Sequence, residues 1–131
     1  MTTMNMVQAI NQTLDMKMSA DDSIVLLGED IGVDGGVFRV TEGLQKKYGA
    51  ERVVDTPLVE LGIVGTAIGM AINGLRPVPE IQFQDFIYTA FDQIINQMAA
   101  MFSAAWKSGV DDDPSPKLAT TILFSFLYLM A

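Results

Sequence analysis

Any chemistry in this chain must use carboxylates, backbone groups or a bound cofactor, because its 131 residues include no histidine and no cysteine. Histidine general bases, Ser-His-Asp triads, thiolate nucleophiles and zinc sites with His or Cys ligands are therefore excluded within it. The best-placed carboxylate is Glu60, which has apolar neighbours and begins a predicted helix. Burial makes a carboxyl group harder to ionise, which suits it to proton transfer.

Glu60 also has a purely structural explanation. A carboxylate in the first turn of a helix is stabilised by the helix dipole, whatever its chemistry. From the residue pattern alone this structural role is the simpler one, and proton transfer is the alternative.

No metal site is predicted within the chain. The segment from Asp30 to Gly35 has the acids and glycines of a calcium-binding loop. Its third position is Gly32, however, and its twelfth is Thr41, where such a loop needs oxygen ligands that include a bidentate carboxylate. Neither a GxxxxGK[ST] string nor a GxGxxG string after a strand is present. We therefore interpret this segment as a turn.

The elements that would position Glu60 alternate between helices and strands. In chain order they are a helix over 7–18, a strand over 24–27, a helix over 40–48, a strand over 52–54, a helix over 60–73, a strand over 77–83 and a helix over 87–105. Such alternation implies βαβ units, so the predicted fold class is α/β, a parallel sheet flanked by helices. We expect the three strands to be neighbours in one sheet, with the 60–73 helix packed against it.

The predicted helix over 60–73 is unusual in its glycines, Gly62, Gly65 and Gly69. Each glycine in a helix interior costs about 1 kcal/mol relative to alanine. Gly65 and Gly69 are four residues apart and share a helix face, where another backbone can approach closely. Tight packing within one chain explains this, and so does a contact between subunits beside an active site.

Composition and charge exclude several classes of partner. A net charge of −8, with only eight basic residues, argues against nucleic acid and against an anionic membrane surface. The first residues lack the pattern of a signal peptide. The longest mostly apolar stretch, over 118–131, is shorter than the roughly 20 residues that span a bilayer. We predict a cytoplasmic protein.

Between Met4 and Ala99 the sequence resembles the beta subunit of the thiamine-diphosphate-dependent decarboxylating component of 2-oxo acid dehydrogenase complexes. Five long strings, in the same order as in that family, carry the resemblance. They are Val25-Leu-Leu-Gly-Glu-Asp, Gly35-Gly-Val-Phe-Arg-Val-Thr-Glu-Gly-Leu, Arg52-Val-Val-Asp-Thr-Pro-Leu, Glu60-x-Gly-Ile-x-Gly-Thr-Ala-Ile-Gly and Gly74-Leu-Arg-Pro-Val-x-Glu-Ile-Gln-Phe-x-Asp-Phe.

This resemblance implies a thiamine-diphosphate-binding fold of the pyrimidine-domain type, incomplete here, with the cofactor between an alpha and a beta subunit of an α2β2 assembly. It implies that Glu60 is the catalytic carboxylate, hydrogen-bonded to the pyrimidine ring nitrogen. Gln82 and Phe86 would line the pyrimidine, Phe86 by stacking. Leu58 would offer a backbone contact and Glu29 a supporting carboxylate. The partner alpha subunit would hold Mg²⁺.

The resemblance fades near the end of the chain. We divide the sequence into a pyrimidine-binding portion over 1–101 and a divergent portion over 102–131, which holds an acidic turn and a hydrophobic tail. The family's beta subunits are more than twice as long, and a histidine expected later in this domain is missing. Val59 and Leu61 also replace the small residues usual beside the catalytic glutamate.

Two functions therefore stay open. The first is a subunit that decarboxylates a 2-oxo acid, pyruvate or a branched-chain one, with the pyruvate type favoured, and that passes the acyl group to a lipoyl-bearing acyltransferase. The second is a catalytically inactive derivative, truncated or engineered, that acts only as a folded oligomerisation module. A transketolase-like enzyme is disfavoured by the Glu-Asp-x-Gly and Gly-Gly-Val-Phe strings.

Overall fold

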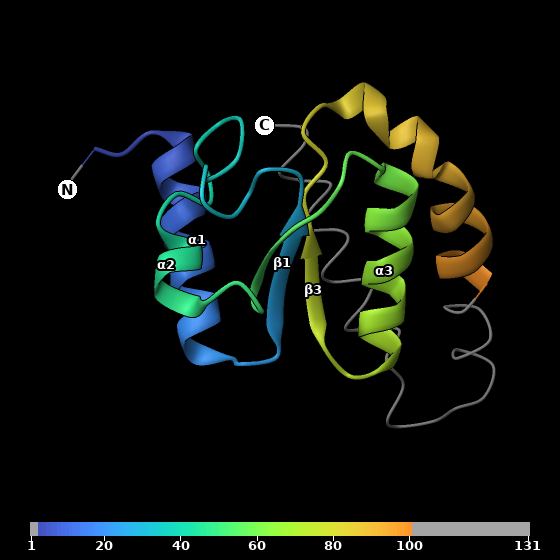
Figure 1. Cartoon of the computed structure of the whole chain (residues 1–131), viewed down its shortest axis with the longest axis horizontal. Coiled ribbons are helices and arrows are strands. Elements are labelled where there is room, and N and C mark those ends of the chain that lie inside the picture. The colour runs from blue at the N-terminus through green and yellow to red at the C-terminus, as the bar shows by residue number, and fades with distance from the viewer. Residues whose placement is uncertain (1–2, 101–131) are drawn as a thin grey trace.

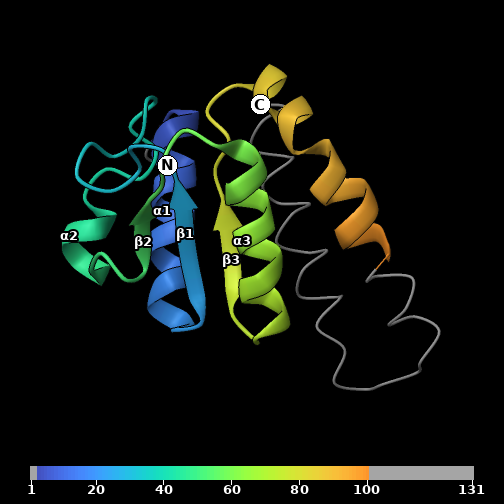
Figure 2. The ribbon, with the colours of Figure 1, turned by 45° about the vertical axis from the view of Figure 1, so that its right-hand side comes forward.

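The computed structural model describes residues 3–100 as alternating helices and strands (Figures 1 and 2). The elements are α1 (Met6–Ala20), β1 (Ile24–Gly28), α2 (Leu44–Tyr48), β2 (Val53–Asp55), α3 (Glu60–Ile72), β3 (Arg76–Pro79), the 3-10 helix η1 (Gln84–Ala90) and the π-helix η2 (Gln93–Met98). The predicted turn at 111–116 and the apolar run at 118–131 lie outside the described residues, as does the end of the predicted 87–105 helix.

The three strands form one parallel sheet in the order β2-β1-β3. Leu26 of β1 pairs with Val53 of β2 on one side and with Val78 of β3 on the other. The predicted α/β class and the predicted pairing of strands are thus confirmed. The connection from β1 to β2 contains α2, and the connection from β2 to β3 contains α3. Parallel strands need such long connections, because a hairpin turn can join only antiparallel strands.

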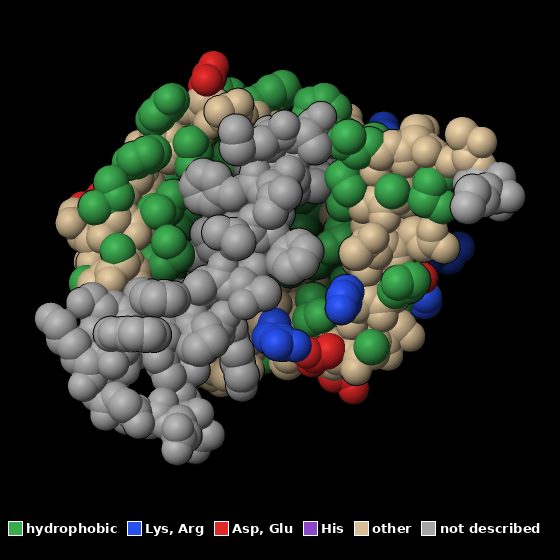
Figure 3. Space-filling model, turned by 180° about the vertical axis from the view of Figure 1, so that it is seen from behind, with side chains coloured by type: hydrophobic (Ala, Val, Ile, Leu, Met, Phe, Trp, Pro, Cys, Tyr) green, Lys and Arg blue, Asp and Glu red, His purple; other side chains and the backbone are tan. Residues whose placement is uncertain are grey.

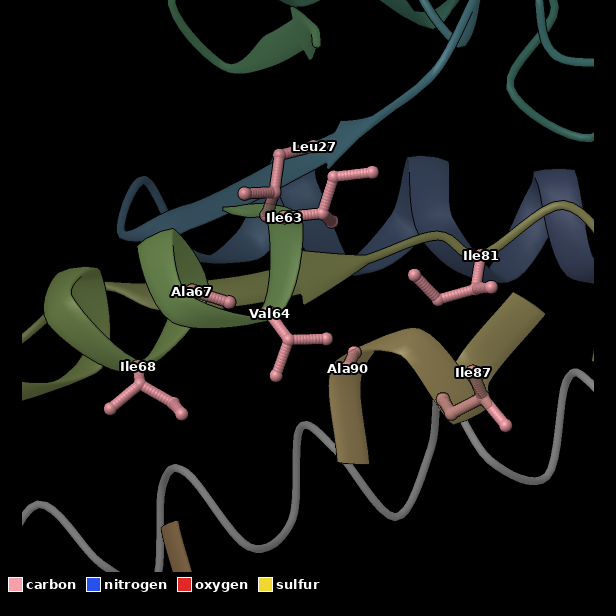
Figure 4. Packing of buried hydrophobic residues seen from close by; sticks show 8 residues of the cluster. All are labelled: Leu27, Ile63, Val64, Ala67, Ile68, Ile81, Ile87 and Ala90. Atoms are coloured by element: carbon pink, nitrogen blue, oxygen red, sulfur yellow. The ribbon is translucent and has the colours of Figure 1, made fainter. Parts of the chain in front are cut away.

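Helices cover both faces of this sheet (Figures 1 and 2). Side chains alternate across the central strand β1, so Leu26 packs with Met18 of α1, whereas Leu27 packs with Ile63 of α3. Because both faces are covered, all five residues of β1 are buried. The core on the α3 side joins this helix to η1, and Figure 4 shows Ile63 of α3 beside Leu27 of β1 and Val64 of α3 beside Ala90 of η1.

Glycine fixes two helix boundaries. Gly74, at φ +87°, follows α3 in the left-handed conformation, and its N–H donates to the carbonyl of Ala71 while that of Leu75 donates to Met70. This pair of bonds is the Schellman motif, which ends the helix at the predicted place. Gly43, at φ +79°, precedes α2. The predicted 40–48 helix is therefore too long, because residues 40–43 form turns.

Two other predicted bounds are wrong. The 77–83 strand ends at Pro79, since its partner β1 ends at Gly28 and leaves no backbone to pair with beyond Glu80. The regular helix expected from residue 87 is a 3-10 helix followed by a π-helix within the described residues. Ile87 and Ala90, three residues apart, are both buried, which suits the three-residue turn of a 3-10 helix.

Candidate functional site at the carboxyl edge of the sheet

Three glutamates follow the carboxyl ends of the three strands. Glu29 comes directly after β1, Glu80 directly after β3, and Glu60 begins α3 after the short connection from β2. Because the strands are parallel, these ends meet at one edge of the sheet, which is where α/β folds bind their ligands. The edge therefore gathers carboxylates from three separate parts of the sequence.

The charges of these carboxylates interact. Partial burial raises the pKa of Glu29, and the neighbouring negative charges of Asp30 and Glu60 raise it further. Burial, with a contribution from Glu29, raises the pKa of Glu80 to about 7. The three side chains thus form a chain of like charges in which Glu29 lies between the other two. Carboxyl groups with raised pKa values, such as those of Glu29 and Glu80, are typical of sites that hold and move protons.

Glu60 is half-buried and has a hydroxyl partner. Thr89 Oγ1 lies 3.2 Å from Glu60 Oε2 and 2.8 Å from the carbonyl oxygen of Phe86. A hydroxyl carries one proton, so it donates to one of these acceptors at a time. The contact places the carboxylate of Glu60 beside η1, next to Phe86. Two of the predicted site residues are thereby brought together.

Gln82 and Glu29 form a second pair. The side-chain amide Nε2 of Gln82 donates to the carbonyl oxygen of Glu29 over 3.3 Å, which ties the segment after β3 to the end of β1. Phe86 lies nearby in an edge-to-face series with Phe83 and Phe38, at centroid distances of 5.5 and 5.7 Å. Its side chain is 40% exposed, so part of its ring is free to stack on a ligand.

Among the predicted site residues, Leu58 has no contact in the described part of the chain that indicates its role. Its side chain is 65% exposed, and its carbonyl accepts no hydrogen bond from the described residues. It precedes Glu60 by two positions, so its backbone lies near the carboxylate through the chain connection alone. Val59 and Leu61, on either side of Glu60, are also exposed.

Two buried side-chain oxygens lack a hydrogen-bond partner within residues 3–100, and both lie at this edge. They are Oε2 of Glu80 and Oγ1 of Thr56, which follows β2. Buried polar groups without partners are rare in native proteins and call for a reason such as catalysis or ligand binding. Among the described residues, no cluster of three or more acidic side chains is arranged to hold a metal ion.

Sequence reasoning missed Glu80 and Thr89. Glu80 is a single acid inside the apolar stretch from Val78 to Ile81, and this isolated charge could have marked it. Its contact with the loop after β1 depends on sheet order, which spacing does not reveal. Thr89 had no signal, because its hydroxyl reaches Glu60 only through the fold of η1.

The glycines of α3 separate into two groups. A Cβ on Gly65 would lie 3.4 Å from Gln93 Oε1 of η2, which is ordinary contact, and one on Gly62 would meet Val59. A Cβ on Gly69 would have nothing within 4 Å among the described residues. Packing within the described residues thus places Gly65 beside η2 without requiring glycine there, and it gives no reason for glycine at position 69.

Residues 2–106 match the model of the transketolase pyrimidine-binding domain family. The chain belongs to that family. It is 56% identical over 99 residues to the pyruvate dehydrogenase E1 component subunit beta of Staphylococcus epidermidis, a match that covers 76% of this chain and 30% of that protein. The equivalent subunit of Leifsonia xyli is 60% identical over 96 residues, or 73% of this chain and 28% of that one.

A relative named for a different 2-oxo acid is nearly as similar. The 2-oxoisovalerate dehydrogenase subunit beta of Pseudomonas aeruginosa is 53% identical over 100 residues, which are 76% of this chain and 29% of that one. The chain spans about a third of the length of these curated relatives. The residues that match the family model, 2–106, include all five predicted site residues. Within residues 3–100 no helix is both long and apolar enough to cross a membrane.

Proposed function

We propose that this chain supplies the pyrimidine side of a thiamine diphosphate site in a 2-oxo acid dehydrogenase, of which it is part of the beta subunit. The observation that carries this proposal is the meeting of Glu60, Glu29, Gln82 and Phe86 at the carboxyl edge of the sheet. The relatives with more than half of their matched residues identical support the same reaction class. We favour pyruvate as the substrate and a branched-chain 2-oxo acid as the alternative.

The residues at this edge fit the chemistry of an aminopyrimidine. When bound, thiamine diphosphate supplies the electron sink that decarboxylation of a 2-oxo acid requires. Glu60 offers a carboxylate that can hold a proton against a ring nitrogen, and the Thr89 hydroxyl can keep its Oε2 in place. Phe86 offers a partly exposed ring for stacking. Gln82 and Glu29 line the same edge, and the Leu58 carbonyl, which accepts no hydrogen bond from residues 3–100, offers an acceptor.

The rest of the site must come from other chains or segments. We propose an alpha subunit that holds Mg²⁺ and the diphosphate in an α2β2 assembly, and a lipoyl-bearing acyltransferase that receives the acyl group. The exposed apolar residues beside Glu60 and the uncovered Gly69 support a protein contact at α3. A cytoplasmic location, without nucleic-acid or membrane partners, remains our prediction.

A chimera tests this function directly. Residues 1–99 of this chain would replace the matching segment of the Staphylococcus epidermidis beta subunit, which would then be assembled with its alpha subunit. We expect cofactor-dependent decarboxylation, with pyruvate turned over faster than 2-oxoisovalerate. A chimera that assembles normally but decarboxylates neither acid would contradict the proposal.

The inactive oligomerisation module is the second candidate, and Gly69 is the observation that favours it. Among residues 3–100 no atom lies within 4 Å of the Cβ position of Gly69, and a glycine on that face of α3 would let another helix approach closely. Under this reading the chain self-associates without cofactor or alpha subunit. Sedimentation velocity of the isolated chain distinguishes the two candidate functions. Self-association would favour the oligomerisation module, because an enzyme subunit would bind a different protein at α3.

A further inference from the structure

Glu80 is a partly buried ionisable group with one fully buried carboxyl oxygen, and the proposed function leaves it without a role. Its Oε2 atom is inaccessible to water and meets no hydrogen-bond donor among the described residues. A buried carboxyl group without a partner is far less costly when neutral than when charged. Its pKa is accordingly raised to about 7, first by burial and then by the charge of Glu29.

Two glycines from the segment after β1 enclose this side chain. A Cβ on Gly28 would lie 2.9 Å from Cβ of Glu80, so only glycine lets β1 end this close to β3. Gly36 returns over the carboxyl group, where its own Cβ position is 3.4 Å from Oε1 of Glu80. Its φ of +78° is in the left-handed region, which favours glycine there. The segment is therefore built to close over Glu80.

We define residues 28–43 as the closing loop, and its internal bonds make it one piece. The N–H of Gly36 donates to the carbonyl of Asp30 over 2.8 Å, and that of Thr41 donates to Gly35 over 3.1 Å. The hydroxyl of Thr41 donates to the carbonyl of Ile31 over 2.6 Å. A displacement of the loop at Gly36 is thus transmitted to its first residues, among them Glu29.

We propose that Glu80 is a positioning residue: its neutral carboxyl group keeps the closing loop shut, and its ionisation opens the loop and withdraws Glu29 from Glu60. The loop movement follows from the packing around Glu80 alone. Its catalytic consequence rests on the proposed function, because it matters only if Glu29 and Glu60 serve a bound cofactor.

The charged groups around the loop fix the direction of this effect. Glu29, next to Glu80, is negative, and so are Asp30 and Glu60 beyond it. Across the loop, Asp55 Oδ1 accepts the N–H of Gly32, while the Arg39 guanidinium donates to the carbonyl of Asp34. None of the described basic groups contributes to the shift at Glu80. A charged Glu80 therefore gains most by reaching water, so the loop is closed at low pH and opens as pH rises through about 7.

Amide chemical shifts of the full 131-residue chain, followed by NMR from about pH 5.5 to 8.5, test the loop movement. We expect the amides of Gly36, Thr41 and Glu29 to titrate together with a midpoint near 7. In Glu80→Gln, which is neutral at every pH, these three amides should lose that titration. The control Glu42→Gln removes an exposed carboxylate from the same loop and should leave it unchanged.

Glu29→Gln provides a second test that does not depend on how well Glu80→Gln folds. Because the charge of Glu29 raises the pKa of Glu80, its removal should move the loop midpoint to lower pH. Loop amides that do not titrate in the wild-type chain, or that titrate unchanged in Glu80→Gln, would overturn the proposal. These measurements need neither cofactor nor alpha subunit, so they stand or fall separately from the proposed function.

The pH dependence of kcat/KM in the assembled chimera tests whether Glu80 positions Glu29. With wild-type Glu80, kcat/KM should fall about tenfold per pH unit above 7, in proportion to the closed fraction. Glu80→Gln should remove this alkaline decline while keeping activity near pH 6. A decline that persists unchanged in Glu80→Gln, although the loop amides no longer titrate, would refute the positioning of Glu29 by Glu80.

Discussion

The two faces of the sheet differ in the kind of contacts that cover them. On the α1 side, directional polar contacts surround a small core and continue to the surface. On the α3 side, an apolar core is joined to an exterior on which hydrophobic side chains predominate (Figure 3). Between residues 77 and 100 there is no lysine or arginine. The polar groups on the α1 side bond to one another, whereas the α3 side exposes apolar surface that suits a protein partner.

Arg52 is the centre of the polar face. Its guanidinium donates to the carbonyl oxygens of Met18, Asp21 and Ile24, which joins the end of α1 to the start of β1. It also lies over the ring of Tyr48, at 5.2 Å from the ring centroid. Every group in this arrangement has its partner within the described residues. Nothing about it requires a ligand or a second chain.

The α3 face contains the proposed site and has fewer such contacts. Leu58, Val59 and Leu61 are exposed around Glu60, and Gly69 is uncovered among the described residues. The two orphaned oxygens, of Glu80 and Thr56, lie at the carboxyl edge that borders this face. Directional polar contacts are thus concentrated on the α1 side, whereas the unsatisfied oxygens lie at the edge of the α3 side. Changes on the two sides should therefore affect different observables.

The largest effect is expected from Glu60→Gln, measured as decarboxylation by the assembled chimera. Glutamine keeps the shape of the side chain but cannot exchange a proton as a carboxylate does, and such a role contributes roughly 10²–10⁴-fold in rate. Stability should change by no more than about 0.3–1 kcal/mol, the value of a first-turn charge. Glu51→Gln, an exposed acid far from the edge, is the control. Near-normal turnover with a lowered melting temperature would show that Glu60 is structural only.

Arg52→Ala should be the most damaging change on the polar face. Its side chain is only 18% exposed, and its loss removes a donor from three carbonyls, of which that of Asp21 keeps the N–H of Ile24, so we expect a loss of roughly 2 kcal/mol or more in the free energy of unfolding. Arg76→Ala is the matched control, because its ion pair with Asp21 is exposed and should contribute about 1 kcal/mol or less. Urea denaturation measures both. Equal losses of unfolding free energy in the two variants would mean that the hydrogen bonds donated by Arg52 do not stabilise the α1 side.

The two sides should also respond oppositely to pH. Hydrogen bonds from Ser23 and Arg76 lower the pKa of Asp21 to about 2, so its contribution to stability is present above pH 3.8 and is lost as pH falls toward 2. The raised pKa of Glu80 means that the folded state binds more protons than the unfolded state between pH 4.5 and about 7. Stability from Glu80 therefore falls across that interval, by at most about 1.4 kcal/mol per pH unit.

Urea denaturation at a series of pH values separates these contributions. Glu80→Gln should remove the decline above pH 4.5 and leave the acid limb, whereas Asp21→Asn should reduce the acid limb alone. The opposite sign for Glu80, a stability that rises from pH 4.5 to 7, would contradict the burial of its carboxyl group.

The smallest effect on the folded chain is expected from Gly69. Gly69→Ala should stabilise the isolated chain by about 0.5–1 kcal/mol, because alanine favours a helix and meets no described atom. The same change, and more strongly Gly69→Leu, should weaken assembly of the chimera with the alpha subunit, as measured by sedimentation. Unimpaired assembly of Gly69→Leu would remove α3 from the partner surface.

Much of the fold was predictable, because local pattern and chain connectivity determine it. Apolar runs at 24–27 and 52–54 and the glycine at position 74 located two strands and the end of α3. The start of α2 and the end of β3 were not predictable in this way. They depend on the φ angle of Gly43 and on where β1 stops offering partners.

The candidate site was predictable where a residue is marked by its own neighbours. Glu60 stood out as an acid at a helix start, and the family strings supplied Glu29, Leu58, Gln82 and Phe86. Their roles remain predictions. Glu80 needed the tertiary structure, since its burial depends on Gly36, which reaches it only after the loop has turned back over the sheet.

Calorimetric titration with thiamine diphosphate and Mg²⁺ tests most directly the central claim, that this chain holds one side of a site completed by a partner. We predict no micromolar binding to the isolated chain, because the proposed site leaves Mg²⁺ and the diphosphate to the alpha subunit. The chimera assembled with its alpha subunit should give a one-to-one isotherm that Glu60→Gln weakens. A tight one-to-one isotherm for the isolated chain would contradict the account, and so would an assembled chimera that binds no cofactor.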